Sequence, residues 1–140
     1  MLETMVIQKS LVLNKKGQIL ILRRNESDDR RPLQWDIPGG RLETGEELIA
    51  GVEREIREES NLGVTGTRVI FTKTERRSWD GGEGNAVFIF YVSYAQSIDV
   101  TVSKEHDRYR WVTLQEAIEL FEYNLHREFF NYILSNKVAL

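Results

Sequence analysis

Cysteine is absent from this 140-residue chain, and proline and histidine occur only twice each. Without cysteine, the chain cannot form disulfides, bind a metal through thiolates or use a cysteine nucleophile. The two histidines, His106 and His126, are too few for a zinc site built mainly of imidazoles. We therefore expect any bound metal to be a hard cation held by oxygen ligands.

Long apolar runs and a strong excess of one charge are also lacking. No apolar run approaches the roughly 20 residues that a membrane helix needs. The first residues, MLETMVIQKS, do not show the basic segment and apolar stretch of a signal peptide. Lys and Arg number 19 against 22 Asp and Glu, which gives no general reason to bind a nucleic acid backbone. We expect a cytoplasmic protein that binds neither membranes nor nucleic acid.

What remains is the composition of one globular domain spanning residues 1–140, because 41% of the residues are hydrophobic. Periodicity and turn residues predict strands at 5–13, 18–24, 35–41, 64–74, 86–95 and 108–112. They predict helices at 46–60, 113–121 and 124–134, a surface loop at 25–34 and a glycine-rich loop at 78–85. This pattern indicates an α/β sandwich, with too few crossover helices for a doubly wound sheet.

The predicted helix at 46–60 carries Glu55, Glu58 and Glu59 in its C-terminal half. At ~100° per residue, Glu55 and Glu59 lie within about 20° of Leu48, on the apolar stripe of the helix. Neighbouring carboxylates repel one another, and the helix dipole disfavours negative charge at this end. A divalent cation would reverse these penalties, because clustered carboxylate oxygens suit Mg²⁺ or Mn²⁺.

The alternative is that this acidic segment is only a solvated helix face. Gly39 and Gly40 argue against it, because two glycines shortly before the helix let the backbone approach a ligand closely. Their carbonyl oxygens then become available as metal ligands. The combination of paired glycines and an acidic helix therefore favours a metal site.

These residues resemble the Nudix hydrolase signature, Gx5Ex7REUxEExGU, in which U is a bulky apolar residue. Here the signature runs from Gly40 to Leu62, with Asn61 in place of the usual glycine. Asparagine is the next-best residue for ending a helix in a left-handed conformation, so we expect the substitution to be tolerated. The lead-in WDIPGGRLETGE and the later run EHDRYRWV extend the likeness over most of the chain. The resemblance implies a Nudix-type α/β/α sandwich with a mixed sheet.

The resemblance also implies a metal-dependent pyrophosphatase that hydrolyses a nucleoside diphosphate linked to another group. The metal would be Mg²⁺ or Mn²⁺, with Glu58 acting directly or through water. The implied metal ligands are the main-chain carbonyl of Gly39 and the carboxylates of Glu55, Glu58 and Glu59. Members of this family commonly form homodimers, which the sequence leaves open.

Catalytic roles follow from the same resemblance. Arg54 and Glu46 would orient the carboxylates. Family members often take a general base or an extra ligand from a glutamate beyond the signature, and Glu105 is the candidate because it precedes the strand of Trp111. A solvated loop carboxylate is the alternative for Glu105. The expected catalytic residues are thus Arg54, Glu55, Glu58 and Glu105.

Other residues offer weaker candidates for substrate binding. Basic side chains near the predicted loop at 25–34 are suited to phosphates, although a solvated basic cluster is the simpler interpretation; they are Arg23, Arg24, Arg30 and Arg31. Trp79, in the predicted glycine-rich loop, is suited to stacking on a base, whereas Trp35 is expected in the core. We take Arg24 and Trp79 as substrate-binding candidates. His106 and His126 are expected to be surface residues or to be satisfied by hydrogen bonds.

The substrate is expected to be a small nucleotide. The proline that ADP-ribose-specific members tend to carry after the signature is missing, as is the additional motif of coenzyme A-cleaving members. A nucleoside triphosphate, normal or damaged, cleaved to a monophosphate and pyrophosphate is therefore favoured. Nucleotide sugars and dinucleoside polyphosphates remain alternatives, as does a non-catalytic nucleotide sensor. The presence of all three glutamates favours an enzyme over a sensor.

Overall fold

The structure, a computed structural model, describes residues 2–140. Its centre is a mixed sheet whose strands follow the order β3-β2-β1-β6-β5, with β4 paired to β1 and β7 paired to β2. The strands are β1 (Leu2–Leu13), β2 (Ile19–Arg24), β3 (Trp35–Asp36), β4 (Gly39–Arg41), β5 (Val64–Trp79), β6 (Gly82–Ala95) and β7 (His106–Val112). The central pair, β1 and β6, is parallel, and the other pairs are antiparallel.

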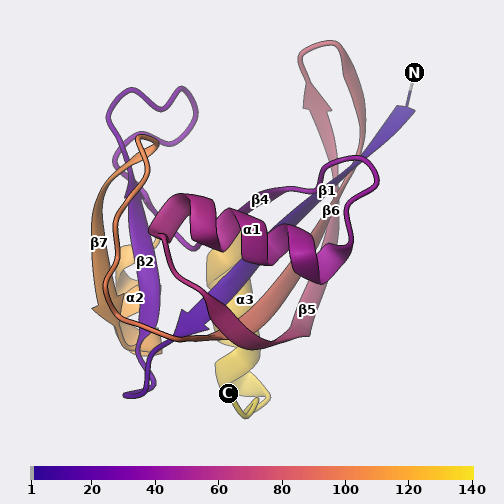
Figure 1. Cartoon of the computed structure of the whole chain (residues 1–140). Coiled ribbons are helices and arrows are strands. Elements are labelled where there is room, and N and C mark those ends of the chain that lie inside the picture. Colours follow the sequence, from indigo (N-terminus) through magenta and orange to yellow (C-terminus); the bar gives the residue numbers. More distant parts are fainter. Residues whose placement is uncertain (1) are drawn as a thin grey trace.

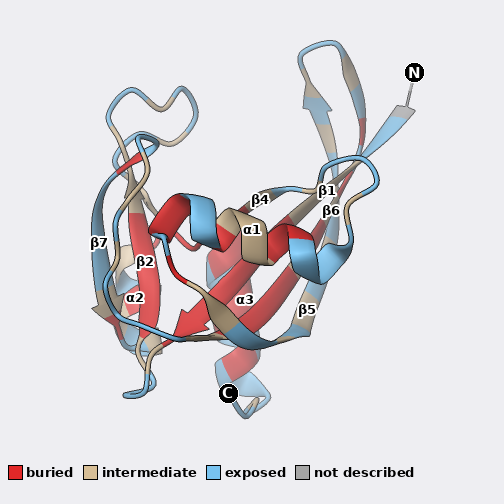
Figure 2. Ribbon diagram, viewed as in Figure 1, coloured by how far each residue is buried: buried red, intermediate tan, exposed pale blue. Residues whose placement is uncertain are grey.

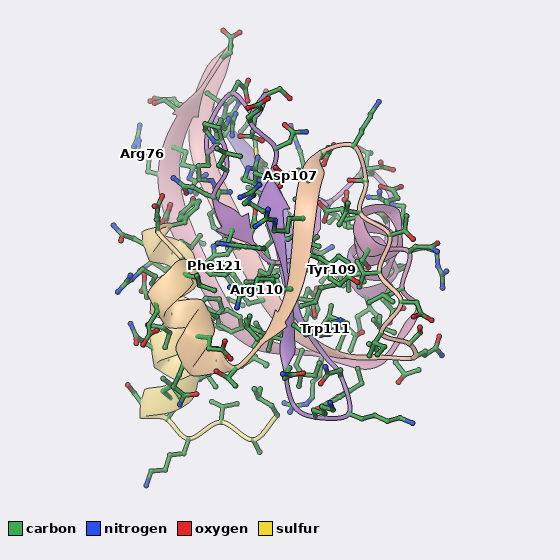
Figure 3. All side chains as sticks on the ribbon, turned by 90° about the vertical axis from the view of Figure 1, so that its left-hand side faces the viewer. Arg76, Asp107, Tyr109, Arg110, Trp111 and Phe121 are labelled. Carbon is green, nitrogen blue, oxygen red and sulfur yellow. The ribbon has the colours of Figure 1, made fainter. Side chains whose placement is uncertain are left out.

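Helices cover both faces of this sheet, as Figure 1 shows. Helix α1 (Leu48–Ser60) lies on one face, while α2 (Leu114–Leu120) and α3 (Asn124–Ser135) lie on the other. The three layers are seen from the side in Figure 3. The predicted α/β/α sandwich is therefore confirmed. No helix within residues 2–140 is long and apolar enough to cross a membrane.

The alternation of side chains along the strands produces a core on each face. Leu11 and Ile21 point toward α2 and α3, where they pack with the aromatic cluster around Phe129. Val12 and Leu20 point the other way and pack against α1. Figure 2 shows the buried residues of α1 and of the central strands facing each other.

Strand β4 brings the paired glycines against β1. Gly39 lies opposite Lys9 in the antiparallel register and has φ of 146°. A Cβ atom at Gly39 would lie 1.9 Å from the carbonyl oxygen of Gln8. Only glycine allows this approach, which fixes the start of the segment that leads to α1.

Helix α1 begins at Leu48 rather than at residue 46, so Glu46 lies in the preceding loop. Leu48 is 42% exposed, so the prediction that it marks the apolar stripe of the helix is wrong. Val52 and Ile56 form the buried part of that stripe. The helix ends as predicted, with Asn61 in the left-handed conformation (φ 62°) and its N–H donated to the carbonyl of Arg57.

The prediction of a glycine-rich loop at 78–85 is wrong. Strands β5 and β6 continue to Trp79 and from Gly82, which pair with each other, so that only Asp80 and Gly81 form the turn. Asp-Gly is a strong signal for such a two-residue hairpin turn, and Gly81 has the positive φ (89°) that the turn needs. The hairpin projects from the body of the sheet at the upper right of Figure 1.

Candidate active site

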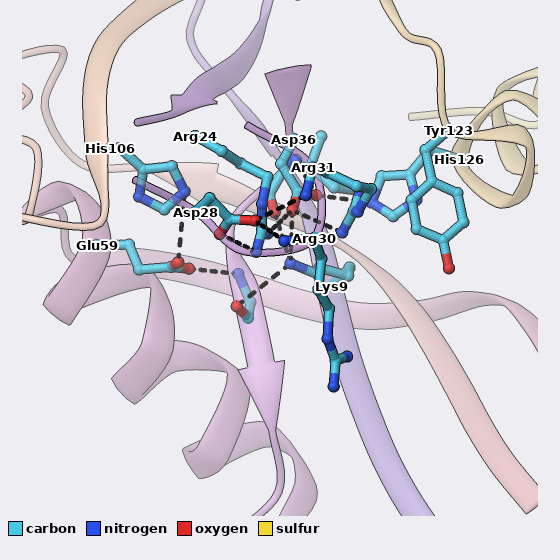
Figure 4. A network of polar contacts seen from close by, with 12 residues as sticks. Lys9, Arg24, Asp28, Arg30, Arg31, Asp36, Glu59, His106, Tyr123 and His126 are labelled. Carbon is cyan, nitrogen blue, oxygen red and sulfur yellow. Dashed lines mark hydrogen bonds and ion pairs between the residues drawn. The ribbon is translucent and has the colours of Figure 1, made fainter. Parts of the chain in front are cut away.

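Glu59 is a buried carboxylate at the C-terminal end of α1. Its side chain is 8% exposed, and its Oε1 accepts a hydrogen bond of 2.7 Å from the main-chain N–H of Gly39. Burial raises the pKa of the Glu59 carboxyl to about 8, because one hydrogen bond does not replace the water that it loses. Figure 4 shows the second oxygen of this carboxylate facing His106. Within residues 2–140, no lysine or arginine forms an ion pair with this carboxylate, and its Oε2 accepts no hydrogen bond.

Glu55 lies one turn earlier on α1 and packs on Gly40. A Cβ atom at Gly40 would lie 2.7 Å from the carboxyl carbon of Glu55, so the glycine makes room for this carboxylate. Burial raises the pKa of Glu55, and the charge of Arg54 partly opposes this rise. The two glycines of β4 thus seat the two inward carboxylates of α1.

Arg54 contacts the carboxylates of Glu46, Glu55 and Glu58. Its Nε donates to Glu46 at 2.6 Å, its Nη1 donates to both oxygens of Glu58 at 3.1 and 3.0 Å, and its Nη2 lies 3.2 Å from Glu55. The side chain of Glu58 is 57% exposed. Arg54 and Glu46 are therefore placed to orient the acidic side chains, as the signature implied.

Glu105 and His106 approach Glu59 from the other side. The loop before β7 is bonded to the end of α1, since Thr101 donates its N–H to the carbonyl of Ser60 and Ser103 to that of Glu59. As a result, Glu59, Glu105 and His106 each offer a ligand atom within 4.8 Å of the others. Three such groups from segments far apart in sequence form a donor set that fits a divalent cation.

His106 differs from the expectation of a surface or satisfied histidine. Its side chain is 4% exposed, and no hydrogen bond to either ring nitrogen is formed within residues 2–140. Burial lowers the pKa of His106. The burial of His106 was not predictable from the sequence, because it comes from packing against α1 and the loop before β7 and not from a local pattern.

A second charged group, Asp36, organises the basic residues beside the carboxylates. Asp36 is 1% exposed, and its Oδ2 accepts from Lys9 at 3.3 Å and from Arg24 at 2.9 Å. Its Oδ1 bonds His126 Nε2 at 2.7 Å, so one ring nitrogen of His126 is paired, while its buried Nδ1 has no hydrogen-bond partner within residues 2–140. Burial alone would raise the pKa of Asp36, but Lys9, His126 and Arg31 outweigh it and hold the pKa well below 3.8. Figure 4 shows this network.

The network and the carboxylates line one cavity of about 600 Å³. Glu59, Glu105, Gly39 and Gly40 contribute to one part of its wall. Six basic side chains also line it: Lys9, Arg24, Arg30, Arg31, Arg41 and Arg77. The cavity therefore combines oxygen donors with a strongly cationic wall, a combination suited to phosphate groups and a metal.

Aromatic rings form a further part of the wall. The guanidinium of Arg31 lies 4.0 Å from the centre of the Tyr123 ring, and that of Arg77 lies 4.8 Å from the centre of the Phe88 ring. Arg77 also donates a hydrogen bond to the hydroxyl of Tyr123. These contacts hold both arginines at the cavity.

Comparison with known proteins agrees with this geometry. A family model described as the NUDIX domain matches residues 8–133. The chain belongs to the Nudix family. Membership makes it a hydrolase that acts on acid anhydrides, and Nudix enzymes generally need a divalent metal ion.

Individual relatives show the same assignment. Nucleoside triphosphatase NudI of Klebsiella pneumoniae is 28% identical over 126 residues, which cover 81% of this chain and 84% of the relative. Nudix hydrolase 5 of Arabidopsis thaliana is 24% identical over 78% of this chain, which spans only 36% of that longer protein. The crystal structure of a MutT protein from Methanosarcina mazei superimposes with a TM-score of 0.80 at 26% identity, covering 99% of this chain and 98% of the other.

Some of the predicted site residues line the cavity, namely Gly39, Glu59, Glu105 and the substrate-binding candidate Arg24. Arg54, Glu55 and Glu58 are not among its lining residues. Trp79 is not among the residues that line it, and Trp35 packs against the core beneath α2 and α3, as expected.

Sequence reasoning missed several residues of the site. Asp36 had one local sign, a single charged residue within the apolar run WDIPGG. Lys9 had none, because it lies between Gln8 and Ser10 in a polar stretch of β1 that does not single it out. Tyr123, just before α3, and Phe88, in β6, reach the cavity only through the tertiary fold.

Proposed function

We propose that the chain hydrolyses a nucleoside triphosphate to a monophosphate and pyrophosphate with the help of Mg²⁺ or Mn²⁺. The observation that carries this proposal is the position of the buried Glu59 carboxylate. It lies beside Glu105 and the paired glycines, in a cavity whose wall carries six basic side chains. A triphosphate, with its high negative charge, suits such a wall better than a nucleotide sugar does.

The metal would be held by oxygen atoms from α1 and β4. We assign as its ligands the carboxylates of Glu55 and Glu59 and the carbonyl of Gly39, with Glu58 acting directly or through water. Lys9 Nζ lies 3.4 Å from the carbonyl oxygen of Gly39, so a cation would compete with Lys9 for this acceptor. When bound, the cation supplies positive charge against the diphosphate and increases the acidity of a bound water.

The protein's own groups perform the remaining tasks. Glu105, exposed at the cavity wall, is placed either to accept the proton of the attacking water or to serve as an extra ligand of the metal. Arg54 keeps Glu55 and Glu58 oriented through the contacts described above. We therefore propose Arg54, Glu55, Glu58 and Glu105 as the catalytic residues.

Different residues are proposed to bind the phosphates and the base of the substrate. Arg24 is fixed by Asp28 and Asp36 and presents a positive charge at the cavity, whereas Arg30 forms no ion pair within residues 2–140 and is free to reach a phosphate. Tyr123 lines the cavity, where its ring packs against the guanidinium of Arg31 and the ring of His126. Stacking of Trp79 on the base stays a prediction, because it requires the projecting hairpin of β5 and β6 to reach the substrate. The partner proposed is thus a small nucleotide, and the compartment proposed is the cytoplasm.

A turnover screen tests this function. Purified protein is incubated with nucleoside triphosphates, oxidised nucleotides, nucleotide sugars and dinucleoside polyphosphates, with Mg²⁺ or Mn²⁺ and with EDTA. We expect pyrophosphate release from one triphosphate class and none with EDTA. Metal binding without turnover of any compound would instead favour a nucleotide sensor.

A pair of variants connects the activity to the site. Glu59→Gln keeps the shape of the side chain and an acceptor for Gly39 but removes the charge, so we expect kcat/KM to fall by more than about a hundredfold. Glu47→Gln, an exposed residue just before α1, is the matched control and should keep its activity. Full activity of Glu59→Gln would contradict the proposed metal site.

A further inference from the structure

His106 is a buried imidazole without a hydrogen-bond partner. Its side chain is 4% exposed and its Nδ1 is fully buried, yet neither ring nitrogen makes a hydrogen bond within residues 2–140. A neutral imidazole carries one donor and one acceptor nitrogen, and leaving such groups unsatisfied in a dry site is costly. His126, by contrast, uses its Nε2 to bond Asp36. Only the Nδ1 of His126 lacks a partner, so of the two histidines His106 is the one whose two ring nitrogens are both unpaired within residues 2–140.

The separation between His106 and Glu59 suits a shared cation. His106 Nε2 lies 3.8 Å from Glu59 Oε2, too far for a hydrogen bond. Two ligand atoms that each bind one cation at ~2.1 Å lie about 3 to 4 Å apart. Since Oε1 of Glu59 is occupied by the Gly39 N–H, Oε2 is the oxygen left for such a cation. Figure 4 shows the imidazole and this oxygen facing each other.

Glu105 adds a third ligand and the surrounding hydrogen bonds hold the set in place. All three residues offer ligand atoms within 4.8 Å of one another. The His106 N–H donates to the carbonyl of Ser103, whose own N–H donates to the carbonyl of Glu59. The carbonyl of Glu105 accepts from the N–H of Asn25. These main-chain hydrogen bonds therefore fix the backbone of His106 close to Glu59, which keeps the imidazole beside the carboxylate.

We propose that His106 is a direct metal ligand, which together with Glu59 and Glu105 forms a mixed nitrogen–oxygen site. Imidazole suits transition metals, whereas Mg²⁺ prefers oxygen and water ligands. The site therefore favours Mn²⁺ over Mg²⁺ through a residue outside the Nudix signature. This inference rests on the proposed metal-dependent function and names the cation that its site prefers.

The direct test is pulsed electron paramagnetic resonance on the tag-free full-length protein loaded with Mn²⁺ alone. A coordinated imidazole produces nitrogen modulation of the Mn²⁺ echo, and replacing natural histidine by ¹⁵N-histidine changes the modulation frequency. We expect this modulation in the wild-type protein, which needs no substitution and so carries no risk of misfolding. Its loss in His106→Gln, with retention in His126→Gln, identifies the ring.

Binding measurements in the absence of substrate give a second readout. By calorimetry, we expect His106→Gln to bind Mn²⁺ about tenfold more weakly, with less than about a twofold change for Mg²⁺. Circular dichroism checks that the variant is folded. Mn²⁺ binding without nitrogen modulation, and with the same ratio of Mn²⁺ to Mg²⁺ affinity in the variant, would overturn the role of His106 and leave the carboxylate site intact. No Mn²⁺ binding by the wild type would overturn the metal site of the proposed function as well.

Discussion

Two buried carboxylates in this protein have opposite electrostatic surroundings. Asp36 is bonded by Lys9, Arg24 and His126, and its pKa lies well below the usual value. Within residues 2–140, the carboxylate of Glu59 accepts a hydrogen bond only from the N–H of Gly39, and burial raises its pKa to about 8. A carboxylate surrounded by cations maintains the structure, whereas one buried without a cation is suited to receive one. This difference separates the structural acid from the acid proposed to bind metal.

Asp36→Asn tests the structural role. The substitution leaves the charges of Lys9, Arg24 and Arg31 without their buried partner, so we expect the free energy of unfolding to fall by about 3–5 kcal/mol near pH 7. The measurement is urea unfolding followed by circular dichroism. Asp29→Asn, at an exposed residue of the loop before β3, is the control and should change stability by less than about 0.5 kcal/mol.

The effect of Asp36→Asn should depend on pH in a defined direction. Because the pKa of Asp36 is lowered on folding, the unfolded chain binds its proton first as the pH falls. The stabilisation by Asp36 is complete above the unfolded pKa of 3.8 and is lost progressively below it. The difference between wild type and variant should therefore narrow near pH 3. A difference that is small at neutral pH, or constant with pH, would contradict the assignment.

The C-terminal turn of α1 is the element that assembles the site. It presents Glu59 to the cavity, and the carbonyls of Glu59 and Ser60 accept hydrogen bonds from the loop that carries Glu105. Asn61 ends the helix in the left-handed conformation, which turns the chain toward β5. The conformation of Asn61 thus contributes to the position of residues on both sides of the metal site.

Substitution of Asn61 tests this helix end. Asn61→Val places a β-branched side chain at φ 62°, so we expect the free energy of unfolding to fall by about 1–2 kcal/mol. Asn61→Gly restores the residue usual in the Nudix signature and should leave stability unchanged or slightly higher. Urea unfolding of the three proteins provides the comparison. Equal stability of the valine and glycine variants would show that the left-handed conformation at residue 61 does not affect the free energy of unfolding.

Charge in the whole molecule is divided between the surface and the cavity. The chain carries a net charge of -3, yet six basic side chains line the cavity. The walls of a cavity shield its field from water and so concentrate it on an anionic ligand. The cavity therefore favours anionic ligands, although the net charge of the chain is negative.

Salt dependence of the kinetics tests this arrangement. We expect KM for the triphosphate found in the screen to rise several-fold between low ionic strength and about 0.15 M salt, while kcat changes little. Arg30→Gln should raise KM and reduce its dependence on salt. Arg76→Gln is the control, because Arg76 is 71% exposed on the projecting hairpin and pairs with Glu83. A KM that is independent of salt would contradict capture by the cavity charges.

Local features of the fold and the site were predictable from the sequence. The periodicity of α1 placed Glu55 and Glu59 toward the sheet, and the helix end at Asn61 followed from turn chemistry. The predicted helix at 113–121 begins with a capping box at Thr113, with hydrogen bonds of 3.2 and 3.0 Å between Thr113 and Glu116. These features depend on residues within a few positions of one another, so propensity and spacing specify them.

Contacts between distant segments were decided by the tertiary structure. Lys9, Asp36 and His126 come from β1, β3 and α3, and only the pairing of β4 with β1 and the packing of α3 bring them together. The burial of His106 likewise depends on the end of α1 and the loop before β7. Such contacts are set by the order and direction of strands in the sheet, which local patterns do not encode. By itself, the sequence thus determined the acidic helix and the family of the protein. The tertiary fold decided which charged side chains surround that helix.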